Sequence, residues 1–245
     1  MDGTVLQISV YLAATFLAAL VAGVTGFAFA LIAAAAWLHV LTPLETATLT
    51  IGYGVIVQGY GAWKLRHAFA WSRIWPFVLG GAPGAAIGAA ILRWANPAYM
   101  RMGIAAFLVA YAVYGLARPQ LRPVHAGVAA DVVVGLLGGM LGAMAGFPGI
   151  LVVIWCGLRG WTRDEQRAVF QPAAVALLAM SAVALAATGP ISRHTIELFV
   201  IGLPALALGT WAGFALYGRL DEATFRKIVL MLLLASGLFL IVSFR

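Results

Sequence analysis

Long apolar runs that carry few charges decide what this chain can fold into. Hydrophobic residues make up 64% of the 245 positions, and charged residues make up only 9%. Runs of about 17 or more apolar residues are long enough to cross the hydrocarbon core of a bilayer. A soluble domain needs a more charged surface than this composition supplies. Since the longest polar stretch, residues 118–125, is only a short loop, we predict a single transmembrane domain over residues 1–245.

The apolar runs divide into ten segments, five in each half of the chain. Helix is the expected conformation, because backbone groups inside a bilayer must pair within their own segment. The predicted segments are 5–24, 27–41, 44–64, 73–93, 98–117, 127–145, 147–159, 164–188, 194–217 and 222–243. Segments 27–41 and 147–159 are short, about 22 Å for the first, so each is either a tilted span or a re-entrant half-helix. The expected fold class is an all-α polytopic membrane protein.

Each half contains an apolar run that is interrupted at glycine. Residues 22–27 read AGVTGF, and residues 143–149 read AMAGFPG. Helices broken at matching places in two halves of a membrane chain indicate the substrate site of a transporter. The alternative is that these glycines only let helices pack closely, as small residues do in membrane proteins.

Other motifs repeat in the same order as the two breaks. Thr42 and Glu45 match Thr162 and Glu165, Thr50 matches Gln171, Pro83 and Gly88 match Pro204 and Gly209, and residues 98–101 match residues 223–226. These matches predict a first repeat at 5–117 and a second at 127–243, connected by a cytoplasmic loop at 118–126. Five segments per repeat would make the second copy inverted in the membrane. The alternative is chance similarity within a chain that is rich in alanine and glycine.

The distribution of basic residues favours the ten-segment count. It places 11 of them on one side, against 4 on the other, whereas eight crossings would divide them 8 against 7. Because cytoplasmic loops carry more Lys and Arg, the side with 11 is predicted to be cytoplasmic. Those residues are Lys64, Arg66, Arg73, Arg118, Arg122, Arg159, Arg163, Arg167, Arg219, Arg226 and Lys227, and the other side carries Arg93, Arg101, Arg193 and Arg245. The net charge of +7 therefore indicates membrane orientation rather than binding to nucleic acid.

The two breaks predict an anion site. Backbone N–H groups at the start of a helix have no partner in the previous turn, and the helix dipole favours a negative charge there. We expect Pro148 in the first turn of such a helix, where its missing N–H costs nothing. The residues expected to bind substrate are Gly23, Thr25, Gly26, Phe27, Thr50, Ala145, Gly146, Phe147, Gly149, Arg167 and Gln171. Other glycines at intervals of four predict packing seams, namely Gly80, Gly84 and Gly88, Gly135 with Gly139, and Gly209 with Gly213.

Asp131 is a candidate coupling residue, since an acid inside a membrane segment suggests a proton carrier. It lies near the end of its segment, so the alternative is a position at the interface or a pair with a loop arginine. No catalytic motif, phosphate-binding loop or metal-ligand spacing occurs in the sequence, so we expect no enzyme activity, no metal and no cofactor.

The ordered motifs resemble those of the sulfite exporter TauE/SafE family. They are the Gly-x-x-Gly-Phe break, the turn TPLETA at residues 42–47, a basic loop and the run GAPGAAIG at residues 81–88, with a second copy of the pattern. The resemblance covers about residues 10–243. It implies a transporter of the bacterial inner membrane that exports a small sulfur-containing anion, such as sulfite or sulfoacetate. It carries over most directly to residues 23–27 and 145–149, although residues 27–30 (FAFA) are bulkier than the common pattern.

The leading hypothesis is therefore a secondary transporter that works by alternating access. A proton- or cation-coupled permease for another small organic substrate is one alternative, and a membrane subunit without transport activity is another. The expected partners are a small inorganic or organosulfur anion and the lipid bilayer, with no nucleic acid. The sequence is compatible with a homodimer as well as with a monomer.

Overall fold

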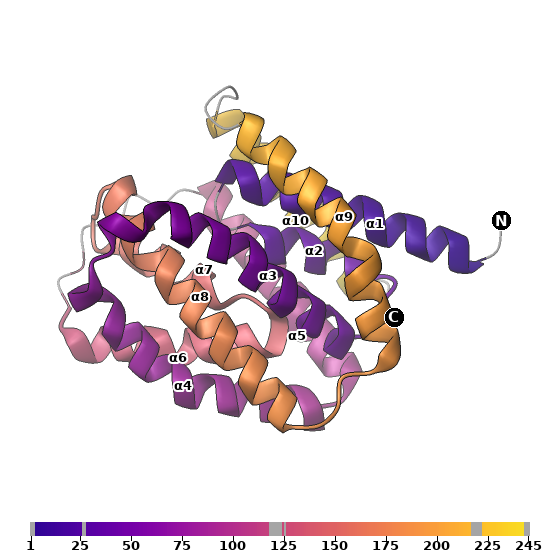
Figure 1. Cartoon of the computed structure of the whole chain (residues 1–245), viewed down its shortest axis with the longest axis horizontal. Helices are drawn as coiled ribbons and strands as arrows, with labels where there is room; N and C mark the ends of the chain where they lie inside the picture. The colour runs from indigo at the N-terminus through magenta and orange to yellow at the C-terminus, as the bar shows by residue number, and fades with distance from the viewer. Residues whose placement is uncertain (1–2, 26–27, 118–123, 125, 217–221, 243–245) are drawn as a thin grey trace. The chain divides into compact units, whose positions relative to one another are not determined.

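The computed structural model describes residues 3–25, 28–117, 124, 126–216 and 222–242, and within them it is all-helical. The helices are α1 (Gly3–Thr25), α2 (Phe29–Trp37), α3 (Pro43–Leu65), the 3-10 turn η1 (Arg66–Ala68), α4 (Trp71–Trp94), α5 (Pro97–Ala117), α6 (Val128–Ala145), α7 (Pro148–Leu158), α8 (Arg163–Ala187), α9 (Arg193–Leu216) and α10 (Glu222–Val242). Each of the ten predicted segments corresponds to one α-helix, so the expectation of an all-α chain is confirmed (Figure 1).

Within the described residues, six helices contain stretches long and apolar enough to cross a membrane. These stretches are Gln7–Val24, Trp71–Trp94, Pro97–Ala117, Val128–Ala145, Glu165–Ala187 and Arg193–Leu216. Helices α2 and α7 have only 9 and 11 residues. At 1.5 Å per residue they are about 14 and 16 Å long, well short of a hydrocarbon core of about 30 Å. Helix α2 is shorter than its predicted segment because the chain leaves the helix after Trp37 and turns toward the start of α3.

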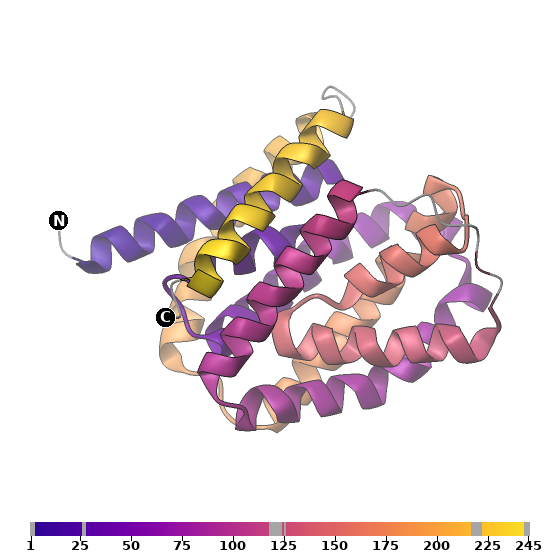
Figure 2. The same ribbon diagram turned by 180° about the vertical axis from the view of Figure 1, so that it is seen from behind.

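The helices form two compact units, and each unit takes helices from both halves of the sequence. Unit 1 comprises Met1–Thr46, Ala95–Pro119 and Arg193–Arg245, and unit 2 comprises Ala47–Trp94 and Gln120–Ser192. In unit 1, α1 packs on α9 and α2, and α5 lies beside α10 (Figure 2). In unit 2, α4 packs on α6 and α8, while α7 contacts α6 and α8. The first helix of each predicted repeat thus packs on the fourth helix of the other repeat.

Backbone-to-backbone contact at glycine brings the paired helices close together. A Cβ atom on Gly84 would overlap the carbonyl oxygen of Leu136, and one on Gly135 would overlap that of Phe77. In unit 1, a Cβ on Gly209 would likewise overlap the carbonyl oxygen of Phe16. The predicted packing seams along α4, α6 and α9 are therefore confirmed.

Helices α3 and α8 begin with the same arrangement of side chains. The backbone N–H groups of Thr42 and Thr162 donate to Oε2 of Glu45 and Glu165 at 3.0 and 2.9 Å. The N–H groups of the two glutamates donate back to the threonine hydroxyls at 3.2 and 3.4 Å. Such reciprocal capping satisfies backbone donors that have no partner within the helix. The two Thr-x-x-Glu motifs matched in sequence therefore have matching local structures.

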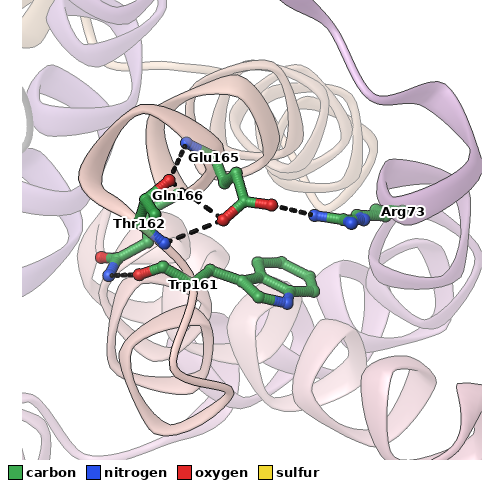
Figure 3. A network of polar contacts seen from close by, with 5 residues as sticks. All are labelled: Arg73, Trp161, Thr162, Glu165 and Gln166. Carbon is green, nitrogen blue, oxygen red and sulfur yellow. Dashed lines mark hydrogen bonds and ion pairs between the residues drawn. The ribbon is translucent and has the colours of Figure 1, made fainter.

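The other oxygen of each capping glutamate faces a basic side chain. Oε1 of Glu45 lies 2.8 Å from Nδ1 of His194 in unit 1. Oε1 of Glu165 accepts a hydrogen bond of 3.2 Å from Arg73 in unit 2, and the Arg73 guanidinium also lies over the ring of Trp161 (Figure 3). Each contact ties the start of a third helix to the start of a fourth helix that belongs to the other predicted repeat.

Substitution of Gly84 by alanine should destabilise the protein by about 1–3 kcal/mol, because the added methyl has no space against the backbone of α6. Gly103 in α5 is the matched control, since a Cβ there meets no atom within 4 Å. Gly103→Ala should be neutral or stabilising by up to about 1 kcal/mol, because alanine favours helix over glycine. Equilibrium unfolding in detergent compares the two, and equal stability of both variants would contradict the close packing of α4 on α6.

Candidate functional site

The second glycine break forms the tip of a helix hairpin in unit 2. Helix α6 ends at Gly146, whose φ of 75° is left-handed and whose N–H donates to the carbonyl of Gly142 at 2.8 Å. Glycine adopts this conformation without the strain that a Cβ would cause. Pro148 then occupies the first turn of α7, as predicted.

Helix α7 runs back along α6 toward its beginning. Pro148 lies next to Gly142 near the end of α6, and Val152 lies near Gly138 one turn earlier in that helix. At the far end, the N–H of Val124 donates to the carbonyl of Leu158 at 2.8 Å. The chain therefore leaves the hairpin close to where it entered (Figure 2).

The tip of this hairpin is buried between α3 and α8. Phe147 is only 1% exposed, and Gly146, Pro148 and Gly149 are buried as well. A Cβ on Gly146 would lie 2.5 Å from Cγ2 of Thr50 in α3, and one on Gly149 would lie 3.2 Å from Cβ of Ala174 in α8. The structure thus brings Thr50 together with the tip residues that were predicted to share its site.

The first turn of α7 presents backbone donors beside this contact. Phe147 precedes the helix and supplies no side-chain cap. The N–H groups of Gly149 and Ile150 have no carbonyl in a preceding turn to bind, and the helix dipole adds positive potential at the same point. Thr50, whose side chain is fully buried, adds a hydroxyl to the surroundings. Chemically, this arrangement suits a small anion without its hydration shell.

Gln171 is buried on α8, but it does not lie beside Thr50. Its side chain contacts the Gly61 position of α3, which is 11 residues, or about 16 Å, from Thr50 along that helix. Ala174, the neighbour of Gly149, follows Gln171 by one turn. Among the described residues, Oε1 of Gln171 has no hydrogen-bond partner although the residue is only 6% exposed. Arg167, one turn earlier on α8, is half-buried.

The first glycine break lies in unit 1, and only part of it is described. Gly26, Phe27 and the side chain of Thr25 lie outside the described residues, so their predicted role stays a prediction. The Trp37 ring at the end of α2 packs at 5.3 Å from that of Tyr11, near the beginning of α1. Helix α2 therefore also runs back along α1, as α7 does along α6.

Gly23 has a packing role. A Cβ on this residue would lie 2.8 Å from Cα of Gly213 in α9, so the two backbones are in contact at this point. This is the close-packing alternative that the sequence left open for the glycines of the breaks. The predicted contact of Gly23 with substrate stays untested.

Asp131 has two partners in unit 2. Its Oδ1 accepts a hydrogen bond of 2.6 Å from Nε1 of Trp155 and lies 3.9 Å from Nη1 of Arg159, which also donates to the carbonyl of Ala126. The pair with an arginine just after α7 was the structural alternative to proton coupling. Because these contacts join the start of α6 to the end of α7, Asp131 closes the open end of the hairpin.

Sequence reasoning missed Ser181. Its fully buried hydroxyl donates to the carbonyl of Leu177 at 2.7 Å and lies against Gly142 near the hairpin tip. The only feature of the sequence that could have indicated Ser181 was its hydroxyl within the otherwise apolar stretch of α8. Trp155 was also missed, because the sequence did not show which tryptophan would reach Asp131.

Replacing Arg159 by glutamine should destabilise the hairpin by about 3 kcal/mol, because it leaves the buried Asp131 carboxylate without its cation. Adding Asp131→Asn should recover most of that loss. Arg193→Gln is the control, since this arginine is paired on the surface with Glu197 and its side chain is 93% exposed. Chemical unfolding of the wild type, these three variants and Asp131→Asn alone is the measurement, and additive losses in the double variant would contradict the ion pair.

Comparison with known proteins identifies a family for this chain. The protein-family model described as Sulfite exporter TauE/SafE matches residues 11–240, nearly the whole chain. The comparisons with curated proteins and with solved structures gave no match. The family is one of transporters that export sulfite and related sulfur anions, and six apolar helices agree with several membrane crossings. The chain therefore belongs to the sulfite exporter TauE/SafE family and is a multi-pass membrane transport protein.

Proposed function

We propose that the protein is a secondary transporter that exports sulfite, or an organosulfonate such as sulfoacetate, across the bacterial inner membrane. The family match supports a sulfur anion as the substrate. The observation that carries the proposed site is the buried hairpin tip, where the first turn of α7 lies between Thr50 and Ala174. The sequence contains no ATP-binding phosphate loop, so the driving force comes from gradients or from a partner protein.

In the proposed site, the backbone N–H groups of Gly149 and Ile150 replace part of the water shell of the anion. An uncompensated charge in a medium of low dielectric constant costs many kcal/mol, so several donors must converge on it. The Thr50 hydroxyl adds a further group from α3. Gly146 is required at the tip, because any side chain there would clash with Thr50 and disturb the start of α7.

Gln171 serves, in this proposal, as a second polar contact along the path of the anion. Its buried Oε1 has no partner among the described residues, which is an unfavourable state that a hydrated or protonated ligand would relieve. Arg167 adds a positive charge one turn closer to the start of α8. The substrate would meet Arg167 and Gln171 before it reaches the hairpin tip.

Alternating access by two inverted repeats is the mechanism that we propose. Its support is the matching of local structures in the two halves, which includes helices α2 and α7 that run back along α1 and α6. The capped starts of α3 and α8 match as well. We further propose that the hairpin of α6 and α7 is re-entrant, since α7 is about half as long as the hydrocarbon core is thick.

Gly146→Ala should reduce sulfite efflux from proteoliposomes at least ten-fold, because it changes the backbone that presents the α7 amides. Gly160→Ala is the matched control, since Gly160 has a similar φ of 72° but lies exposed in the turn after α7. Both variants carry similar backbone strain, so they differ in location and in the contact with Thr50 that only Gly146→Ala would disturb. Normal efflux by correctly inserted Gly146→Ala protein would remove the hairpin tip from the substrate path.

Gln171→Ala should raise the sulfite concentration needed for half-maximal efflux several-fold, with less effect on the maximal rate. Gln7→Ala is the control, because Gln7 lies exposed on α1. An efflux curve that is the same for both variants would show that Gln171 is not on the path.

A further inference from the structure

Arg101 on α5 is a half-buried charge in unit 1 that has no counter-ion among the described residues. One terminal nitrogen, Nη2, donates to the carbonyl of Leu41 at 3.2 Å. Its Nε is buried and has no hydrogen-bond partner in the described part of the chain. None of the ion pairs formed by described residues involves Arg101. The guanidinium therefore keeps a buried donor that no described group satisfies.

The surroundings of Arg101 make this position more positive still. It lies near the N-terminus of α5, where the helix dipole already favours a negative charge. The cap of this helix is the neutral amide of Asn96, whose Oδ1 accepts from the N–H of Ala98 at 2.8 Å. Glu45, the acid that follows Leu41 most closely in sequence, is engaged by Thr42 and His194. Nothing described at this end of α5 compensates the guanidinium.

His39 and Ser236 provide further hydrogen-bonding groups nearby. Nε2 of His39 lies 3.3 Å from Oγ of Ser236 on α10, and that hydroxyl donates to the carbonyl of Ala35. His39 lies in the turn after α2, where partial burial and the neighbouring Arg101 guanidinium lower its pKa. An anion held between them would offset that repulsion.

We propose that Arg101 and His39 form a second oxyanion-binding site, in unit 1, for a small group such as sulfite or a phosphate. The free Nε and a terminal nitrogen of a guanidinium form a fork that matches two oxygens of an oxyanion. The site shares no residue with the hairpin tip and goes beyond the proposed transport path. This proposal rests on the proposed function only in the choice of sulfite as the first ligand to be tested. A free anion and the phosphate of an acidic lipid have the same chemistry at this fork.

The test measures binding to the full-length protein in nanodiscs of phosphatidylcholine. Labelled sulfite should occupy two classes of site, and Arg101→Gln should abolish one or weaken it at least ten-fold. Arg193→Gln is the matched control, because it removes the same charge from an exposed arginine of unit 1. Gly146→Leu should remove the other class, so loss of the tip site and loss of the Arg101 site are distinguishable.

A second arm uses nanodiscs that contain phosphatidylglycerol and counts the lipids retained by the protein in native mass spectrometry. Retention that depends on Arg101, without a second class of sulfite sites, supports the oxyanion site and assigns it to a lipid phosphate. If Arg101→Gln and Arg193→Gln bind sulfite and retain lipid equally, the proposal is overturned.

Arg101→Lys covers the case in which the glutamine variant does not fold. It keeps the charge but loses the two-nitrogen fork, so it should bind the probe several-fold more weakly while the protein stays intact. Unchanged binding in a folded lysine variant would also overturn the proposal.

Discussion

Close contact between helix backbones is the constraint on which unit 2 depends. Helices α4 and α6 meet through glycines such as Gly84 and Gly135, with no space between them for a side chain. Because lipid tails are as apolar as leucine, such contact relies on van der Waals packing rather than on the exclusion of water. With α6 held in this way, the hairpin tip has a fixed position between α3 and α8, and the start of α7 is fixed with it.

The helices and seams could be predicted because their signals are local. Long apolar runs gave helix positions close to those observed, and glycines spaced by four gave the packing faces. The partners of each helix could not be predicted, since nothing local in α1 indicates that it packs on α9. Thr50 and Gln171 illustrate the same difficulty. They occupy matching positions in the two sequence repeats, but matching positions need not be in contact in the structure. The structure accordingly puts Thr50 at Gly146 and Gln171 at Gly61.

Asp131 in unit 2 and Arg101 in unit 1 differ in whether a group of opposite charge among the described residues lies beside them. This difference separates a charge with a structural role from a charge that is a candidate for ligand binding. Asp131, singled out in the sequence, is held by Trp155 and Arg159 at the open end of its hairpin. In the sequence, Arg101 was only one of four basic residues on the side predicted to face outward. In the structure, its Nε has no partner among the described residues. A sequence shows where charges are, whereas compensation depends on neighbours distant in the chain.

The short length of α7 also has an electrical consequence. If the hairpin is re-entrant, as proposed, an anion bound at the N-terminus of α7, about 16 Å from the end of the hairpin, would have about half of the membrane thickness on either side. Moving one elementary charge through the whole membrane field is worth about 2.3 kcal/mol per 100 mV. A dianion leaving a cell with a negative interior would therefore gain about 2.3 kcal/mol per 100 mV on each half of its path, so that the resting potential alone would favour export.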